Sequence, residues 1–245
     1  MSALLAAEAL KLRTTRTMWA LLGATLGVTA LAVAGAVLSA DDTTLDLESD
    51  RGVRTVLHVS GAGAVFVLVL GVIISAGEYR QRTAVDTFLT TPQRWRVVVA
   101  KLVTGLTVGA GFGAGASLVA MAVADHTYRT EGYTLPLSSG DLWSTLGGSV
   151  LYAALFGAIG AATGSLVRNQ VGAIVGCLGW LFVVENLVLE IAPRVGRWLP
   201  AAAGRALVRD PAGELLSQST AAVVLATYAA VVVVAAVVGE SRRDA

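Results

Sequence analysis

Long apolar blocks alternate with short polar segments along the whole chain. Each block runs for about 20 residues, the length that an α-helix needs to cross a hydrocarbon core about 30 Å thick. The blocks lack the strict alternation of apolar and polar residues that marks the strands of a membrane barrel. The pattern therefore predicts an all-α membrane protein with six transmembrane helices. The expected spans cover residues 18–40, 56–76, 102–124, 142–167, 171–192 and 220–239.

Composition leads to the same class of protein. Apolar residues make up 55% of the 245 residues and charged residues 14%, with a mean hydropathy of +0.71. A soluble domain carries about 25% charged residues, so the composition disfavours a water-soluble fold. We expect residues 1–245 to form a single transmembrane domain, with residues 1–17 as a cytosolic segment. The first span is expected to remain in the protein, because it exceeds the roughly 7–15 residues of a signal-peptide core.

Lys and Arg beside the spans set the orientation, because basic segments are retained on the cytoplasmic side. They gather before span one, between spans two and three, and in the C-terminal tail. The segment after span one has only Arg51 and Arg54 among five acids. We therefore expect a multi-pass plasma-membrane protein with both termini in the cytoplasm. Residues 193–218, which this topology places outside, disagree with it through Arg194, Arg197, Arg205 and Arg209.

Glycines recur at four-residue spacing within several spans. This spacing places small residues on one helix face, where two helices approach closely and gain van der Waals contact. The glycines between Gly109 and Gly115 lie inside a transmembrane-length run with no preceding strand, which disfavours a nucleotide-binding loop. The expected packing seams are Gly23 with Gly27, Gly105 with Gly109 and Gly113, Gly160 with Gly164, and Gly172 with Gly176.

Motifs for catalysis are missing from the sequence. It has no GxxxxGK[ST], HExxH, GxSxG or CxxC pattern, which excludes a self-contained ATPase. His58 and His126 are the only histidines, and no set of metal ligands surrounds them in sequence, so we interpret them as ordinary interfacial residues. We expect a protein that is not an enzyme and binds no cofactor itself.

Residues 77–102, between spans two and three, form the expected cytosolic loop. Thr83 and Asp86 have the spacing of a helix capping box, with Asp in place of the usual Glu or Gln. Thr91 and Pro92 begin a second, basic helix that runs into span three. The alternative is an interfacial helix whose arginines bind anionic lipid headgroups. The apolar residues that share one face of the first helix are Val85, Phe88 and Leu89.

Span five carries polar residues deep in the membrane. At 1.5 Å per residue, Glu185 lies about 21 Å along the helix and roughly 9 Å short of the far edge of a 30 Å core. A carboxylate at that depth normally faces protein or a water-filled passage. Glu185, Asn186 and Glu190 are therefore candidates for a substrate passage. In the alternative, Glu185 pairs with a basic neighbour or is protonated, and Glu190 lies at the interface near Arg194.

Residues 193–216 alternate helix breakers with apolar turns that are too short to span the membrane. We expect a short external helical segment between spans five and six, and the alternative is an ordinary external loop.

Four segments, in this order along the chain, resemble the ABC-2 type permease family in its actinobacterial form. The resemblance covers nearly the whole chain and rests on the order and spacing of the segments. They are AEALKLRTTRTMW before span one, GEYRQRTAVDTFLTTPQRWRVVVAKL between spans two and three, LVRNQVGAIVGCLGWLFVVENLVLE across span five, and RWLPAAAGRAL after it.

The resemblance implies a half-transporter that works with other chains. Two ATP-binding cassette ATPase subunits would hold ATP and Mg, and a second permease subunit, identical or related, would complete the membrane part. Membrane lipid is a further expected partner and nucleic acid is not. The resemblance also implies a cytosolic coupling helix in which Val85, Phe88 and Leu89 dock into an ATPase groove, flanked by Glu78 and Arg82. The N-terminal segment departs from the family's amphipathic helix, because Glu8 falls between Leu4 and Leu5 around the helix.

Three functions follow as hypotheses. The first is ATP-driven export of a hydrophobic or amphipathic compound, such as a drug, antibiotic, lipid or peptide. The second is a proton-coupled secondary transporter that uses Glu185. The third is a non-transport membrane partner of another complex.

Overall fold

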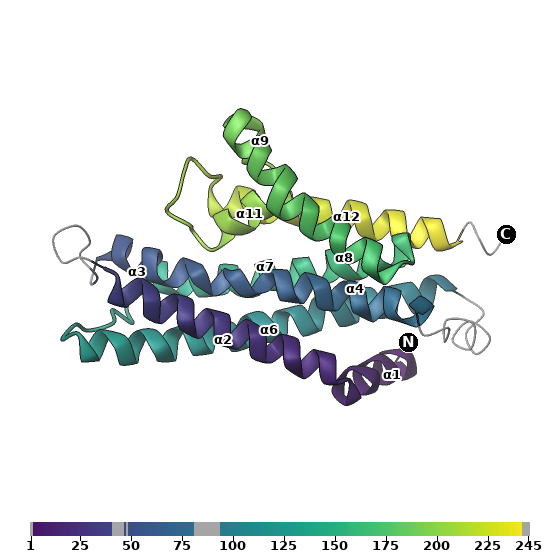
Figure 1. Ribbon diagram of the computed structural model, residues 1–245, viewed down its shortest axis with the longest axis horizontal. Coiled ribbons are helices and arrows are strands. Elements are labelled where there is room, and N and C mark those ends of the chain that lie inside the picture. The colour runs from purple at the N-terminus through teal and green to yellow at the C-terminus, as the bar shows by residue number, and fades with distance from the viewer. Residues whose placement is uncertain (1, 41–46, 48, 81–93, 242–245) are drawn as a thin grey trace.

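The computed structural model describes residues 2–40, 47, 49–80 and 94–241, and the regular structure of these residues is helical throughout. Within them, six helical runs are long and apolar enough to cross a membrane, which confirms the predicted multi-pass membrane protein. The runs lie side by side as an elongated bundle (Figure 1). They are Arg16–Leu38, Asp50–Arg80, Trp95–Thr130, Gly140–Val167, Gln170–Ile191 and Gln218–Glu240.

Spans two and three are longer than their apolar cores. Span two consists of α3 (Asp50–Leu57), the 3-10 turn η1 (His58–Gly63) and α4 (Ala64–Arg80). Span three is α6 (Arg94–Thr130), so the basic helix expected to lead into this span is present from Arg94 onward. A long apolar run predicts only the apolar part of a helix, and both of these helices continue past the two ends of their apolar runs.

Helix α7 (Gly140–Val167) forms the centre of the bundle and packs against α4 and α6. A Cβ atom on Gly105 or Gly109 of α6 would overlap the α7 backbone, and one on Gly160 would overlap the carbonyl oxygen of Leu68 in α4. The predicted glycine seams of spans three and four are therefore closed, and backbone contact holds these three helices together.

The outer helices are packed much less tightly. Within an 18-residue apolar stretch of each span, 67% of the residues are buried in span four, against 22% in α2 (Arg16–Leu38) and 22% in α12 (Gln218–Ser241). Among the described residues, no atom outside the helix lies within 4 Å of a Cβ built on Gly23, Gly27 or Gly176. These predicted seams face outward in the single chain.

Span five is divided and tilts away from the bundle at its far end (Figure 1). It consists of α8 (Gln170–Gly179), the π-helical turn η2 (Trp180–Val184) and α9 (Glu185–Ile191). Two short helices, α10 (Pro193–Gly196) and α11 (Pro200–Leu207), follow before α12, which confirms a helical segment between spans five and six. Helix α11 lies directly on the ring of Tyr152 in α7, because a Cβ on Gly204 would overlap that ring.

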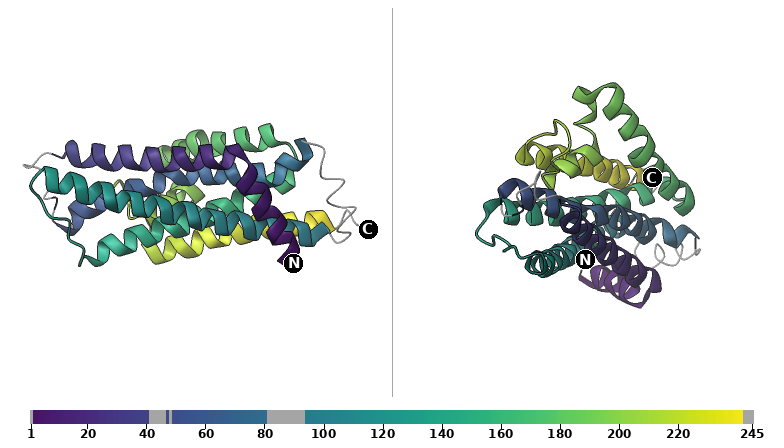
Figure 2. Two further views of the ribbon diagram at one scale, coloured as in Figure 1. Left: turned by 90° about the horizontal axis from the view of Figure 1, so that it is seen from below. Right: turned by 60° about the vertical axis from the view of Figure 1, so that its left-hand side comes forward.

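Both chain ends lie at one end of the bundle, where α4 ends and α6 begins (Figure 1). Helix α1 (Ser2–Thr14) turns away from α2 at Thr15 and crosses α6 (Figure 2). It does not present an apolar stripe, which agrees with the departure from an amphipathic pattern noted in its sequence. Instead, α1 buries one carboxylate, that of Glu8, together with Leu12.

Candidate functional site

A buried ammonium group joins three helices where span two ends and span three begins. Lys101 of α6 is only 4% exposed, and its Nζ lies 3.1 and 3.2 Å from the two carboxylate oxygens of Glu8 in α1. The same Nζ lies 2.9 Å from Oε1 of Glu78 in α4. It also donates a hydrogen bond to the carbonyl oxygen of Ile74, at 3.3 Å. Lys101 of α6 is thus bonded to both α1 and α4.

Lys11 adds a second positive charge and makes the group electrically balanced. Its Nζ lies 2.7 Å from Glu78 and 3.1 Å from Glu8, while half of its side chain stays exposed. Partial burial by itself lowers the pKa of Lys11, but the hydrogen bond to Glu78 and the charges of Glu8 and Glu78 outweigh burial and raise the pKa above its ordinary value. We call Glu8, Lys11, Glu78 and Lys101 the ion cluster.

The ion cluster lies at the ends of the two helices that bound residues 81–93. Of the residues expected to couple to an ATPase, Glu78 is part of this cluster and holds α1. The other coupling candidates, Arg82, Val85, Phe88 and Leu89, lie outside the described residues, as do the helix starts expected at Thr83 and Thr91.

A second bridge lies at the same end of the bundle. Arg168, at the turn between α7 and α8, forms an ion pair with Glu240 of α12. Its guanidinium also lies 5.2 Å from the ring centre of Tyr79 in α4, within the range of a cation–π contact. Arg168 has a positive φ of 55°, a conformation that ends α7 and turns the chain into α8. This residue therefore ties the last span to the core.

Glu185 is turned into the protein, although its span is mostly exposed. It is 1% exposed, and its Oε2 accepts a hydrogen bond from the backbone N–H of Ala201, at 2.7 Å. Helix α11 starts after Leu199, which has no side-chain acceptor for the free N–H groups of its first turn. Glu185 supplies that acceptor from another helix, and a carboxylate is favoured at a helix N-terminus. Within the described part of the chain, its Oε1 has no hydrogen-bond partner.

The side chains of Asn186 and Glu190 have different surroundings from that of Glu185. Both line a cavity of about 520 Å³ that is bounded by α9, α10, α11 and residues 212–215. Asn186 donates a hydrogen bond to the carbonyl oxygen of Phe182, at 2.9 Å. The three candidates therefore divide into one carboxylate that anchors α11 and two side chains that border an open cavity beside it.

Comparison with protein-family models and with curated proteins finds no match for this chain.

The opposite end of the bundle carries a polar network that explains an unexpected feature of the sequence. Arg209 forms an ion pair with Asp141, the first-turn acid of α7, and donates a hydrogen bond to Ser144 at 2.7 Å. Arg54 of α3 lies 3.0 Å from the same Asp141, and Arg205 lies 2.8 Å from Asp210. Two of the four arginines that disagree with the expected topology are therefore neutralised by neighbouring acids.

The histidines have no metal-binding surroundings in the described residues, where no group of three His, Cys, Asp or Glu side chains comes together. Nδ1 of His58 lies 2.7 Å from the carbonyl oxygen of Thr55, and its Nε2 is 4.0 Å from Asp210.

The sequence interpretation missed the role of Glu8 and Lys101. The sequence shows only that Glu8 interrupts an apolar face and that a basic residue, Lys101, precedes an apolar run. A spacing of three residues between Glu8 and Lys11 also predicts a helical ion pair. Pairing across 93 residues, however, depends on how α1 crosses α6, which no local pattern encodes.

Proposed function

We propose that this chain is the membrane-spanning permease subunit of an ABC exporter in the plasma membrane. It moves a hydrophobic or amphipathic compound with energy from ATP that is hydrolysed on separate ATPase subunits, and it has no ATPase site of its own. Two ATPases and a second permease subunit complete the transporter, and both termini face the cytoplasm. The proposal draws on the resemblance of the four sequence segments and on the arrangement of the helices around residues 81–93.

The observation that carries the proposal is a continuous rigid connection from that loop to the centre of the bundle. Residues 81–93 are bounded by α4 and α6, which the ion cluster fastens to α1. The same two helices meet α7 through backbone contacts at Gly71 and Gly105. A force applied to the loop therefore moves α4, α6 and α7 together, as a rigid-body switch between two access states requires.

In this mechanism the ATPase grips Val85, Phe88 and Leu89 as a helix in a groove. Glu78 and Arg82 flank this contact, and Glu78 also transmits it to α1 and α6 through the ion cluster. Closure of the ATPases on ATP shifts the loop, and the core helices follow. The loosely packed α2 and span five then change their positions relative to the core, which opens the passage on the other side.

The coupling contact is tested by replacing Phe88 and Leu89 with Asp. We expect the permease to stay folded in the membrane but to lose co-purification with its ATPase, because two charges replace the apolar residues that enter the groove. Leu137→Asp, an exposed apolar position at the opposite end of the bundle, is the matched control and should keep the ATPase bound. Undiminished co-purification of the Phe88→Asp/Leu89→Asp variant would refute the docking contact.

The passage is proposed to run beside α11, where Asn186 and Glu190 line the cavity and Glu185 holds the adjacent helix. In Glu185→Gln the amide oxygen still accepts the Ala201 N–H, so the amount of folded protein should be unchanged, while loss of the negative charge lowers transport. Glu185→Leu removes the acceptor and should also destabilise the protein, by about 1–3 kcal/mol. Transport by the Gln variant equal to that of the unchanged protein would count against a role of Glu185 in the passage.

Proton-coupled transport is the second candidate, and the buried carboxylate of Glu185 is the observation that favours it. Transport that continues without ATP but stops when an ionophore collapses the proton gradient would replace the first proposal with this one. If the chain is instead a non-transport partner, neither ATP nor a proton gradient would drive uptake into vesicles that contain it.

A further inference from the structure

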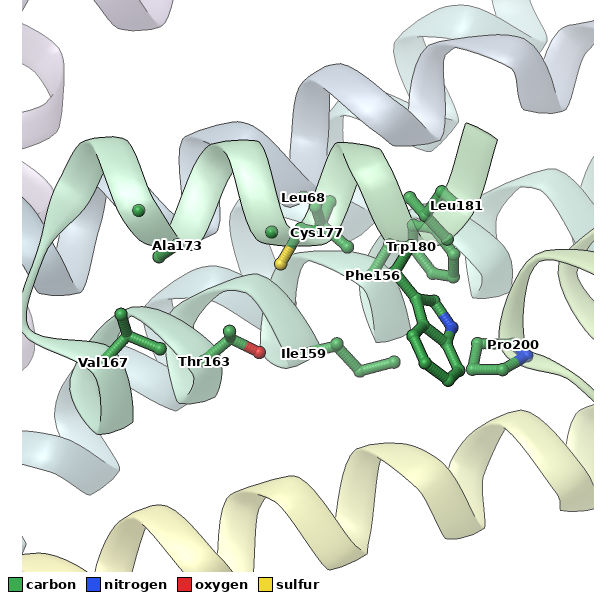
Figure 3. A pocket seen from close by; sticks show the side chains of 12 residues that line it. Leu68, Phe156, Ile159, Thr163, Val167, Ala173, Cys177, Trp180, Leu181 and Pro200 are labelled. Carbon is green, nitrogen blue, oxygen red and sulfur yellow. The ribbon is translucent and has the colours of Figure 1, made fainter. Parts of the chain in front are cut away.

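An apolar cavity lies between α7 and α8, on the side of the bundle away from the ion cluster's α1. It has a volume of about 290 Å³. Side chains from both sides face it, with Ile159 and Thr163 on α7, Cys177 on α8 and Trp180 at the start of η2, and Pro200 of α11 closes one end (Figure 3). We call this space the α7–α8 cavity.

One wall of the α7–α8 cavity is a glycine seam with no helix packed into it. Gly172 and Gly176 have the spacing of helix-packing glycines, yet a Cβ built on Gly176 meets no described atom within 4 Å. The equivalent glycines of α6 touch the α7 backbone. The shape that normally accommodates a neighbouring helix is therefore open along α8, beside the cavity that Gly172 and Gly176 help to line.

The position of the cavity determines what surrounds it. Gly172 lies near the start of α8, and Trp180 is eight residues further on, about 12 Å along the helix. The cavity therefore runs lengthwise through most of one leaflet, whose hydrocarbon part is about 15 Å thick. At that depth the molecules available to enter from the side are hydrocarbon chains.

Size and chemistry of the lining agree with a hydrocarbon occupant. Apart from the Thr163 hydroxyl and the Cys177 thiol, the side chains that line the cavity are apolar, with the indole N–H of Trp180 at one end. Apolar cavities of about 150 Å³ already hold a benzene molecule and exclude water. A space nearly twice as large accommodates several carbons of a flexible chain, and an unfilled space would forfeit the dispersion contacts of its lining.

We propose that the α7–α8 cavity binds one acyl chain of a membrane phospholipid, inserted between α7 and α8 from the leaflet next to the ion cluster. This site is separate from the proposed passage beside α11 and does not depend on the proposed function. Lipid bound there fills the open glycine seam and supports span five against the core of the bundle.

The test uses the full chain in vesicles of phosphatidylethanolamine and phosphatidylglycerol, with a small fraction of phosphatidylglycerol that carries a photoreactive diazirine in one acyl chain. After illumination, labelled positions are mapped by mass spectrometry. We expect label at Ile159 and Thr163 inside the cavity. Lipid at the outer surface should label Val171 and Val175, which are 64% and 63% exposed on the same helix as Gly176.

Gly176→Leu places a side chain into the cavity from α8, and Thr163→Leu fills it from α7. Both should reduce the label at Ile159 several-fold and leave the label at Val171 and Val175 unchanged. Gly27→Leu is the matched control, because Gly27 also has open space around it but lies on α2. Label at Ile159 that persists in both filled variants, or its absence from the unchanged protein, would overturn the proposal.

A second arm separates lipid from other hydrocarbons. It replaces the photoreactive phospholipid with a photoreactive long-chain alcohol in vesicles of the same composition. Label at Ile159 from the phospholipid supports the lipid site, whereas label from the alcohol alone would assign the cavity to a different hydrophobic ligand and refute the lipid assignment.

Discussion

Lys101→Met is expected to destabilise the folded protein by about 3–5 kcal/mol. The substitution keeps the length and apolar stem of the side chain but removes the only buried ammonium between Glu8 and Glu78. Lys11 is half-exposed and remains to neutralise one of the two carboxylates, so the other is left buried without a counter-charge. Unfolding of the protein in lipid by a denaturing detergent, followed by the loss of helical signal, measures the effect.

Two companion variants make this result specific to the buried charge. Lys11→Met removes an exposed partner and should cost less than about 1 kcal/mol. Replacing Glu8 and Glu78 by Leu in the Lys101→Met protein leaves the half-exposed Lys11 as the one charge of the ion cluster, and apolar replacement of a buried ion pair is often neutral. Stability should therefore recover in the triple variant. Equal stability losses in Lys101→Met and Lys11→Met would mean that the ion cluster does not hold α1 to the bundle.

Gly157→Ala and Gly27→Ala are expected to change stability in opposite directions. A methyl group on Gly157 of α7 would overlap the carbonyl oxygen of Gly105 and lie 3.2 Å from Val67. Two backbones must separate to admit it, which costs about 1–3 kcal/mol and breaks the contact between the core helices. Around Gly27 of α2 there is open space among the described residues, and Ala favours a helix by up to about 1 kcal/mol over Gly.

The same unfolding measurement in lipid compares the two variants. Gly157→Ala should unfold at lower detergent concentration than the unchanged protein, and Gly27→Ala at an equal or higher one. A stable Gly157→Ala protein would show that the backbone contact between α6 and α7 is not needed for the core. A strongly destabilised Gly27→Ala protein would show that α2 buries this face against something other than its own chain.

Local patterns predicted the spans well because each span must satisfy the membrane on its own. A backbone that crosses lipid must form a long apolar helix, and such a helix can be recognised in a window of about 20 residues. The same reasoning identified the short helices after span five, where Pro193 and Pro200 each occupy a first turn. The helix that leads into span three was predicted from a different signal, a capping residue followed by proline at Thr91 and Pro92, and α6 is present from Arg94 onward.

Glycine spacing predicted possible contacts but not which of them form. The seams at Gly105 and at Gly160 are closed by backbone, whereas those at Gly27 and Gly176 are open, although the local sequences look alike. The difference arises from the order of the helices in space. Since α7 lies at the centre, seams that face it are filled, and seams on peripheral helices are not.

The candidate site was predictable only in part. Depth in the membrane singled out Glu185, and the structure confirms that it faces protein, but its partner is the backbone of Ala201 and not a basic side chain. The partner of Glu185 could not be predicted because every residue except proline has a main-chain N–H, so no sequence pattern identifies the one at Ala201. The ion cluster could not be predicted for a related reason, since its charges come from residues 8, 11, 78 and 101 and meet only after α1 has folded across α6.

The π-helical turn in span five changes the direction in which the side chains after it point. A turn of this kind takes up one residue more than an α-helical turn, and each residue of a helix advances the side-chain direction by about 100°. Compared with uninterrupted α-helical winding, the side chains of Glu185 and the rest of α9 are therefore rotated by about that angle around the axis of span five. Span five therefore consists of two helical segments, α8 and α9, whose side chains point in directions that continuous α-helical winding would not give. Its first half is aligned with the core helices, and its second half is aligned with α11.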